Sequence, residues 1–279
     1  MKKFLNTMLA TAAVVAASTT AYAATGKVAQ GFYLGASAGA ANTNVKYNTV
    51  SAGPFIPDSL IGTTTSTAYQ KVTNSNAGKM AGIFGLLAGY NFQSGSLVFG
   101  GEIYGGFDST KVTVSDDTGS GANLTQWSTT VKRTNFMGFA PRLGFMVAPN
   151  TLMYARLGAE FGKWKASINP NAAGMASQLA AYNAAGVAGQ VLITPAALAK
   201  SQQVTSGSKG GMSFAPGLGM EVYMGKAFLR AQYSYLFGPT IKLTQDITGV
   251  SPLVANGTTT THTFKTSQHK VELAVGYKF

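Results

Sequence analysis

The sequence predicts an all-β fold, an eight-stranded antiparallel up-and-down transmembrane β-barrel with four long extracellular loops. Three observations indicate this. Eight segments alternate apolar and polar side chains, and no apolar run after residue 23 is long enough for a membrane helix. Within the segments, most charged side chains lie on the face opposite the apolar ones. Successive side chains of a strand point to opposite faces. An apolar outside with a charged inside is what a barrel immersed in lipid needs.

Residues 1–23 have the pattern of a secretory signal peptide. Two lysines precede an uncharged, mostly apolar run from Phe4 to Ala17, and Ala21-Tyr22-Ala23 supplies small residues for cleavage. The run is shorter than the roughly 20 residues that cross a bilayer as a helix, which disfavours a membrane anchor. We therefore expect a signal peptide over 1–23 and an outer-membrane β-barrel over 24–279.

Composition excludes several classes of protein. The chain has no cysteine, so it has neither disulfides nor thiolate metal sites. Charged residues make up 11% of the chain, well below the usual share in a soluble domain. The net charge of +12 could indicate a nucleic-acid partner, but no basic cluster is interleaved with aromatic residues, and export argues against it. We expect no nucleic acid.

Eight segments alternate with period two, and short and long connections alternate between them. Short turns are expected at 93–96, 148–150 and 224–226, and long connections at about 43–79, 109–133, 165–210 and 239–266. This layout is typical of an outer-membrane barrel and places both termini in the periplasm. The expected strands are Gly31–Asn42, Met80–Phe92, Leu97–Phe107, Met137–Val147, Thr151–Trp164, Met212–Tyr223, Ala227–Phe237 and Ser267–Phe279.

Seven charged side chains have the inward parity of their strands. They admit two interpretations: a structural ion-pair network that fills the lumen, joined by Lys270, or a gated conductance pathway. An eight-stranded barrel has an interior just wide enough for side chains, which favours the network. The seven residues are Glu102, Arg142, Arg156, Glu160, Glu221, Arg230 and Glu272.

Two proline motifs repeat within the barrel. Residues 139–144 (FAPRLG) resemble residues 214–219 (FAPGLG), and each begins a hairpin with an inward arginine in its return strand. Proline removes a ladder hydrogen bond, so we expect a kink or bulge at Pro141 and at Pro216.

No arrangement of residues predicts catalysis. Nucleophilic catalysis needs a nucleophile with a histidine and a carboxylate in reach. The chain has two histidines, His262 in a threonine-rich loop and His269 facing outward, and neither has an acid at a suggestive spacing. We expect both to be solvated surface residues, and we expect no enzyme activity, cofactor or metal site.

The long connections are the expected interaction regions. Residues 171–202 are rich in alanine, and Thr194-Pro195 resembles a helix start, so short helices or a flexible loop are both open. Most of the excess lysines fall in the long connections. Beside an outer leaflet rich in lipopolysaccharide, they could bind anionic lipid head groups or glycans.

Several motifs together resemble a known group of proteins. Gly31-Phe32-Tyr33-Leu34-Gly35, Tyr154-Ala155-Arg156-Leu157-Gly158 and the closing Val275-Gly276-Tyr277-Lys278-Phe279 look like the small outer-membrane β-barrel domain family. That family includes OmpA-like transmembrane domains and opacity-type or porin-family surface antigens of Gram-negative bacteria. The resemblance covers the barrel alone, so we expect no peptidoglycan-binding domain of the kind that OmpA carries.

The resemblance implies partners and a role. In that family the barrel-assembly machinery reads a terminal aromatic residue, which is Phe279 here. The alternating outward residues before it fit the same signal, namely Val271, Leu273, Val275 and Tyr277. The expected partners are this machinery, outer-membrane lipid and lipopolysaccharide, and host surface molecules bound by the long loops. We expect a structural and surface-interaction protein, an adhesin or antigen, with a narrow porin for small solutes as the alternative.

Overall fold

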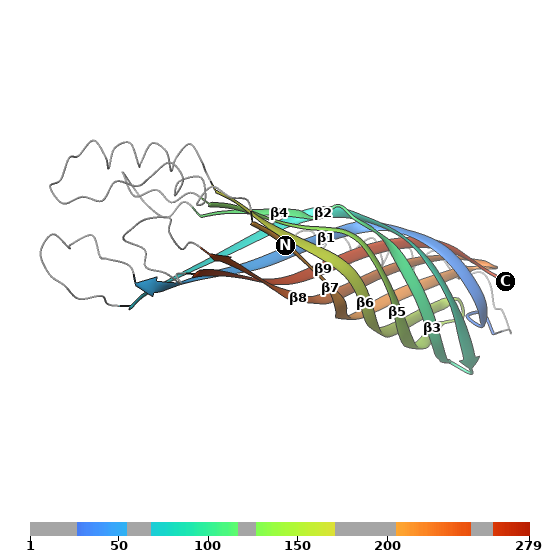
Figure 1. Ribbon diagram of the computed structural model, residues 1–279. Helices are drawn as coiled ribbons and strands as arrows, with labels where there is room; N and C mark the ends of the chain where they lie inside the picture. The colour runs from blue at the N-terminus through green and yellow to red at the C-terminus, as the bar shows by residue number, and fades with distance from the viewer. Residues whose placement is uncertain (1–26, 55–67, 117–126, 171–204, 247–258) are drawn as a thin grey trace, which may run out of the picture.

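The computed structural model describes residues 27–54, 68–116, 127–170, 205–246 and 259–279, and these form one antiparallel sheet rolled into a ring (Figure 1). No helix within these ranges is long and apolar enough to cross a membrane. The expected signal peptide, residues 1–23, and the segment 171–202 lie outside the described residues. The strands are β1 (Gly31–Pro54), β2 (Ala68–Ser94), β3 (Leu97–Asp108), β4 (Lys111–Asp116), β5 (Trp127–Ala148), β6 (Thr151–Pro170), β7 (Thr205–Met224), β8 (Ala227–Asp246) and β9 (Thr259–Lys278).

The ring closes through β5. The sheet order is β3-β2-β1-β9-β8-β7-β6-β5-β4, and an additional pairing joins β3 to β5. β3 pairs with Asn135–Phe145 of β5, and β4 pairs with Trp127–Lys132 of the same strand. β4 therefore continues the line of β3 beyond residues 109–110. The described part of the chain has nine strands where the sequence predicts eight, because β4 lies in 109–133, which is expected as a long connection.

Most strands are much longer than a membrane crossing requires. β1 and β2 contain 24 and 27 residues, against roughly 9–11 for a tilted strand that crosses the hydrocarbon. The described residues within the ranges expected as long connections are therefore mostly strand. The three short turns lie where they are expected, and Gly95 and Gly225 in two of them have φ angles of 59° and 65°, which glycine adopts without strain.

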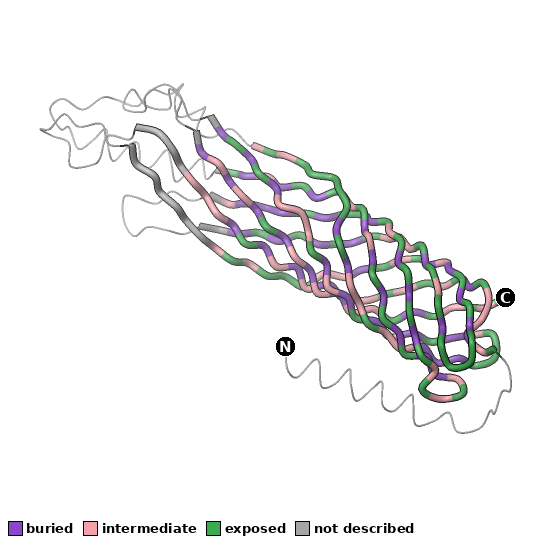
Figure 2. Tube along the Cα trace, turned by 90° about the horizontal axis from the view of Figure 1, so that it is seen from below, coloured by how far each residue is buried: buried purple, intermediate pink, exposed green. Residues whose placement is uncertain are grey.

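The wall has an apolar outer surface at the end of the ring that holds the short turns, called here the short-turn end. Exposed and buried residues alternate along each strand there (Figure 2). Side chains beside the exposed ones point into the ring, as the pleat requires. The exposed apolar residues include Phe32, Leu34, Phe84, Leu86, Phe99, Ile103, Phe139, Leu143, Met153, Leu157, Phe214, Leu218, Leu229, Leu273 and Val275.

The polarity reverses toward the other end of the ring. In that part, called here the extension, the apolar side chains point inward and form one cluster, while lysines such as Lys46 and Lys165 lie on the outside. This is the ordinary pattern of a protein surrounded by water. The cluster contains Val45, Tyr47, Val112, Val114, Val131, Trp164, Ala166, Ile168, Ala215, Leu236, Ile241, Leu243 and Phe264.

The extension consists of two sheets instead of a closed ring. Among the described strands, residues 68–82 of β2 pair with β1 alone, and β4 pairs with β5 alone. Likewise residues 205–213 of β7 pair with β6 alone, and residues 240–246 of β8 pair with β9 alone. The ring therefore divides along two seams into the sheets β8-β9-β1-β2 and β4-β5-β6-β7. Figure 1 shows the blue and red strands diverging from the green and yellow ones.

The two prolines interrupt pairing without shifting it. The β5–β6 register skips Pro141 and the β7–β8 register skips Pro216, and both resume in the same phase. Neither proline therefore forms a bulge, and a kink at these positions stays a prediction. Register shifts occur instead between Arg133 and Phe136, between Met146 and Ala148, and between Phe237 and Thr240.

The reversal of polarity along β6 gives a matched pair of substitutions. Trp164→Ala should lower the free energy of unfolding by about 3–5 kcal/mol, because Trp164 is 1% exposed and its removal leaves a cavity in the extension. Phe161→Ala on the outer wall of the same strand should cost much less, because lipid or detergent fills the space. Urea unfolding of the refolded protein in lipid vesicles measures both, and equal losses would contradict the two-zone description.

Candidate functional site

The interior of the ring is filled in layers, starting with an apolar layer at the short-turn end. It includes Tyr33 of β1, Leu152 of β6 and Phe228 of β8, all buried. The rings of Tyr33 and Phe228 meet edge to face with centroids 5.7 Å apart. Ala29, which precedes β1, donates its backbone N–H to the Gln93 side chain at 2.9 Å. The chain before β1 is thereby held at this end of the lumen.

The second layer is an ion-pair network around two glutamates. The Glu102 carboxylate on β3 lies 2.6 Å from Arg230, 3.2 Å from Arg142 and 3.2 Å from Arg156. Glu221 on β7 pairs with Arg142 and, at 2.8 Å, with Arg230. All five side chains are buried. The network thus joins five strands, because β3 and β7 supply the carboxylates and β5, β6 and β8 supply the arginines. Each charge lies beside at least one opposite charge, which burial demands.

Tyrosines complete this central network. Tyr33 donates its hydroxyl hydrogen to Glu102 at 2.9 Å, and Tyr223 donates to Glu221 at 2.6 Å. The guanidinium group of Arg142 lies 4.0 Å from the centre of the Tyr154 ring. These contacts satisfy lone pairs that the arginines leave free and cover cation faces with aromatic rings.

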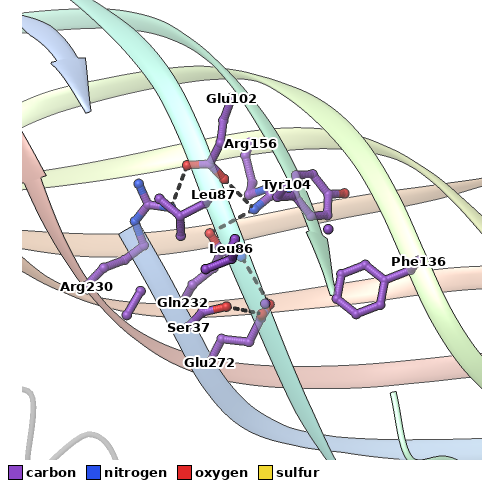
Figure 3. Close-up of a pocket in the computed structure, with 13 residues that line it drawn as sticks. Ser37, Leu86, Leu87, Glu102, Tyr104, Phe136, Arg156, Arg230, Gln232 and Glu272 are labelled. Carbon is purple, nitrogen blue, oxygen red and sulfur yellow. Dashed lines mark hydrogen bonds and ion pairs between the residues drawn. The ribbon is translucent and has the colours of Figure 1, made fainter. Parts of the chain in front are cut away.

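Glu272 faces the lumen beside this network but is only half buried. It accepts hydrogen bonds from Ser37 at 3.3 Å and from Gln232 at 3.5 Å (Figure 3). The described contacts include no ion pair to it. The cavity that it lines together with Glu102 and Tyr104 has a volume of about 20 Å³, which holds about one water molecule.

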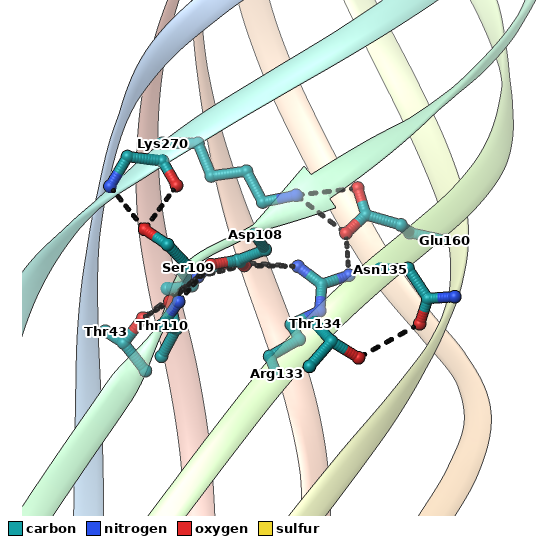
Figure 4. Close-up of polar contacts among 11 residues, drawn as sticks. Thr43, Asp108, Ser109, Thr110, Arg133, Thr134, Asn135, Glu160 and Lys270 are labelled. Carbon is teal, nitrogen blue, oxygen red and sulfur yellow. Dashed lines mark hydrogen bonds and ion pairs between the residues drawn. The ribbon is translucent and has the colours of Figure 1, made fainter.

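A third layer contains a second ion-pair network, which separates the central network from the core of the extension. Arg133 lies 3.2 Å from Asp108 and also pairs with Glu160 (Figure 4). Lys270 lies 2.6 Å from Glu160. Gln268 accepts from Arg133 at 3.0 Å and donates to Asp108 at 2.8 Å. The layer is buried throughout.

The structure thus distributes the seven expected lumen residues over two networks and a neighbouring position. Glu102, Arg142, Arg156, Glu221 and Arg230 lie together, Glu160 lies in the second network with Lys270, and Glu272 lies beside the first. The sequence analysis missed Asp108 and Arg133. Asp108 has the parity of Glu102 and could have been found. Arg133 could not, because the register shift between Arg133 and Phe136 reverses its parity relative to Arg142.

Both histidines differ from a catalytic pair. The expectation that His262 is a solvated surface residue is wrong: its side chain is 2% exposed, and its Nδ1 lies 2.7 Å from the Tyr47 hydroxyl. Burial within the extension lowers the pKa of His262 to about 4. His269 does face outward, with its Nδ1 2.8 Å from the Tyr233 hydroxyl. The described residues contain no group of three potential metal ligands.

The expected assembly signal lies on the outer surface of β9. Leu273, Val275, Tyr277 and Phe279 are exposed, and Val271 is partly exposed. The Phe279 ring lies against Phe32 of β1, with centroids 5.9 Å apart, and its backbone N–H donates to the Phe32 carbonyl at 2.9 Å. The last residue therefore helps to join the first strand to the last one. Recognition by the assembly machinery stays a prediction.

A closed ring at one end, an apolar outer wall and a charged interior are the properties of a membrane barrel. The family model described as "Outer membrane protein beta-barrel domain" matches residues 9–279. The chain belongs to this family. It is an outer-membrane β-barrel protein, and the resemblance seen in the sequence is confirmed.

Solved structures with detectable likeness are also outer-membrane barrels. Ail, the attachment invasion locus protein of Yersinia pestis, is 15% identical, with 86% of this chain and 99% of that chain covered and a TM-score of 0.30. Neisserial surface protein A is 12% identical, with the same coverage and a TM-score of 0.30. The outer membrane protease OmpT from Escherichia coli is 6% identical, covers 92% and 99%, and has a TM-score of 0.39. No match was found among curated proteins. Likeness at this level carries no argument about activity.

The central network predicts a specific double-mutant result. Glu102→Gln should lower the free energy of unfolding by roughly 3–5 kcal/mol, because it leaves Arg156 buried without a carboxylate. Arg142 and Arg230 keep Glu221, whereas Arg156 has its described ion pair with Glu102 alone. Adding Arg156→Gln should therefore recover part of the loss. Urea titration in lipid vesicles measures all three variants, and strictly additive losses would contradict a structural role for this pair.

The buried histidine predicts a pH dependence. A neutral His262 contributes stability that is complete above the unfolded pKa of about 6.5 and declines as pH falls toward 4, because the unfolded chain binds the proton first. His262→Gln should make the free energy of unfolding depend less on pH in this window. The loss of free energy between pH 6.5 and pH 4 should be smaller than in the parent by up to about 2–3 kcal/mol. The matched control is His269→Gln, which should follow the parent protein. A parent-like profile for His262→Gln would contradict the assignment.

Proposed function

We propose that this outer-membrane protein is a non-conducting surface protein, an adhesin or antigen, whose barrel anchors a stiff two-sheet extension outside the cell. In the proposed orientation in the outer membrane, the short turns and both ends of the chain face the periplasm, and the extension and the long connections face the outside of the cell. The observation that carries the proposal is the filled interior: apolar side chains, two ion-pair networks and the core of the extension follow one another along the axis.

A filled interior argues against a transport role. Each buried charge in the networks is held by opposite charges, so opening a path would leave charges unpaired in a medium of low polarity. The alternative, a narrow porin for small solutes, is favoured by the polar lumen near Glu102 and Glu272, where a small cavity exists. A conducting state would need both networks and the apolar core to move aside.

The extension supports a role in surface interaction. Its strands continue well beyond the apolar band, and its own core makes it rigid without lipid. The proposed partners are host surface molecules on the outside, lipopolysaccharide and other outer-membrane lipid around the wall, and the barrel-assembly machinery at β9. We retain the expectation that the protein is not an enzyme.

The register allows a direct test by shortening each hairpin at a pair of facing residues. Tight turns placed after Lys46/Asn76, Thr113/Thr130, Lys165/Ser208 and Lys242/Thr263 remove most of the extension and keep the membrane wall. Bacteria that display the shortened protein should adhere to host cells several-fold less than bacteria that display the full chain. Heat-modifiable migration on a gel is the control for a folded barrel.

Conductance distinguishes the two candidate functions. The refolded full chain in a planar bilayer should show no steady channel, whereas steady openings of reproducible size would establish the porin and overturn the proposal. Unchanged adhesion by a folded, shortened protein would also count against it, because the extension would then have no part in surface interaction.

A further inference from the structure

The outer face of the extension carries three lysines in one cross-strand row. Lys111 of β4 is the direct partner of Lys132 of β5, and Lys132 is the direct partner of Lys165 of β6. All three are exposed. Directly opposite side chains in a sheet lie about 4.5–5.5 Å apart, and like charges in these positions repel one another. The row therefore concentrates positive charge at a cost in stability that a bound anion would offset.

No described carboxylate on this face offsets the repulsion. The acidic residues whose side chains the structure describes all face the interior, namely Glu102, Asp108, Glu160, Glu221 and Glu272. The described ion pairs include none to the three lysines. The outer wall above the apolar band is thus cationic, with exposed lysines at Lys46, Lys111, Lys132, Lys163, Lys165, Lys242 and Lys265.

The backbone behind the row is held in place by the core of the extension. Val112, Val131 and Trp164, the sequence neighbours of the three lysines, point to the other side of the sheet and are almost fully buried. The three Cα positions are therefore set before any ligand arrives. A ligand loses less free energy by ordering such a site than by ordering lysines on a loop.

The distance of the lysine row from the apolar band indicates which kind of ligand it contacts. On β5 and β6 the large apolar side chains of the outer wall nearest the row are Met137 and Phe161; Lys132 lies five residues before Met137, and Lys165 lies four residues after Phe161. At about 3.3 Å per residue this is roughly 13–17 Å along the strand. The row faces sideways from the wall, so a lipid that stands beside the barrel reaches it with its head group. A soluble polymer would first meet the ends of the strands.

We propose that Lys111, Lys132 and Lys165 form a binding site for the phosphate groups of a phosphorylated glycolipid of the outer leaflet. The proposal rests on the orientation given under Proposed function, in which the extension lies outside the cell. It makes a defined site of what the sequence suggests only as a general attraction between basic connections and anionic lipid. Three lysines in a row, with the Cβ atoms of direct neighbours about 5 Å apart, fit a head group that carries more than one phosphate.

The opposite sheet of the extension provides a matched control. Lys46 and Lys265 are direct partners there, but Lys242 faces Thr263, so this group is not a continuous row. It has the same number of lysines and a similar height above the apolar band. The variant K111Q/K132Q/K165Q should bind lipid A in detergent micelles at least ~10-fold more weakly than the parent, because it loses the charge-assisted hydrogen bonds that the row donates to the phosphates. The variant K46Q/K242Q/K265Q should lose no more than about threefold.

Native mass spectrometry or calorimetric titration with lipid A measures the affinities, and three further measurements complete the test. The parent and the row variant, K111Q/K132Q/K165Q, should bind dephosphorylated lipid A with equal affinity. The variant K111R/K132R/K165R should bind lipid A with the affinity of the parent. Equal losses in the two glutamine triples, or no loss in the row variant, would overturn the site. If the row variant loses affinity for a soluble heparin fragment and keeps it for lipid A, the ligand is a soluble polyanion and the lipid proposal is wrong. Adhesion and conductance are measured separately, so failure of this site is distinguishable from failure of the proposed function.

Discussion

The mutual compensation of buried charge is the constraint on which the rest of this structure depends. The described interior holds five carboxylates, Glu102, Asp108, Glu160, Glu221 and Glu272, and five cationic groups, Arg133, Arg142, Arg156, Arg230 and Lys270. An isolated charge in such a place is too costly to keep, so the strands can close only in the arrangement that brings these groups together. The wall, the plugged lumen and the cationic exterior all follow from this arrangement.

The same strands serve two environments, and they change from one to the other by two different means. In β5 and β8 a register shift, between Arg133 and Phe136 and between Phe237 and Thr240, reverses which parity faces inward. An extra residue in one strand has this effect in any antiparallel pair. In β6 the parity is continuous, and the composition changes instead: outward Phe161 gives way to outward Lys165, with Trp164 inside. The long strands β1, β2 and β5 to β9 thus cross from lipid to water without ending, whereas β3 is followed by β4 after a break at residues 109–110.

This explains how far the sequence could be interpreted. The fold class, the short turns and the lumen positions follow from parity in the lipid-facing part, where one rule holds throughout. The sequence pattern predicts loops for the residues of the extension, because apolar residues cease to face outward there. His262 shows the error clearly: Phe264, Thr266, Gln268 and Lys270 share its parity and are buried with it, so the inward face of β9 runs unbroken beyond the expected strand start at Ser267. Arg133 is different in kind, since no parity rule anticipates a bulge.

The placement of the acidic residues links the interior to the exterior. The chain has only 9 acidic residues against 21 lysines and arginines, and five of the nine face the interior, four of them in the networks and Glu272 beside the first one. Among the residues whose side chains are described, the lysines of the outer wall have no acidic partner on their own surface, and they concentrate where the apolar band ends. A neutral interior that is filled with side chains offers little to a solute, whereas a cationic wall above an apolar band is complementary to an anionic leaflet. The charge distribution therefore places the chemistry that this protein can do on its outside.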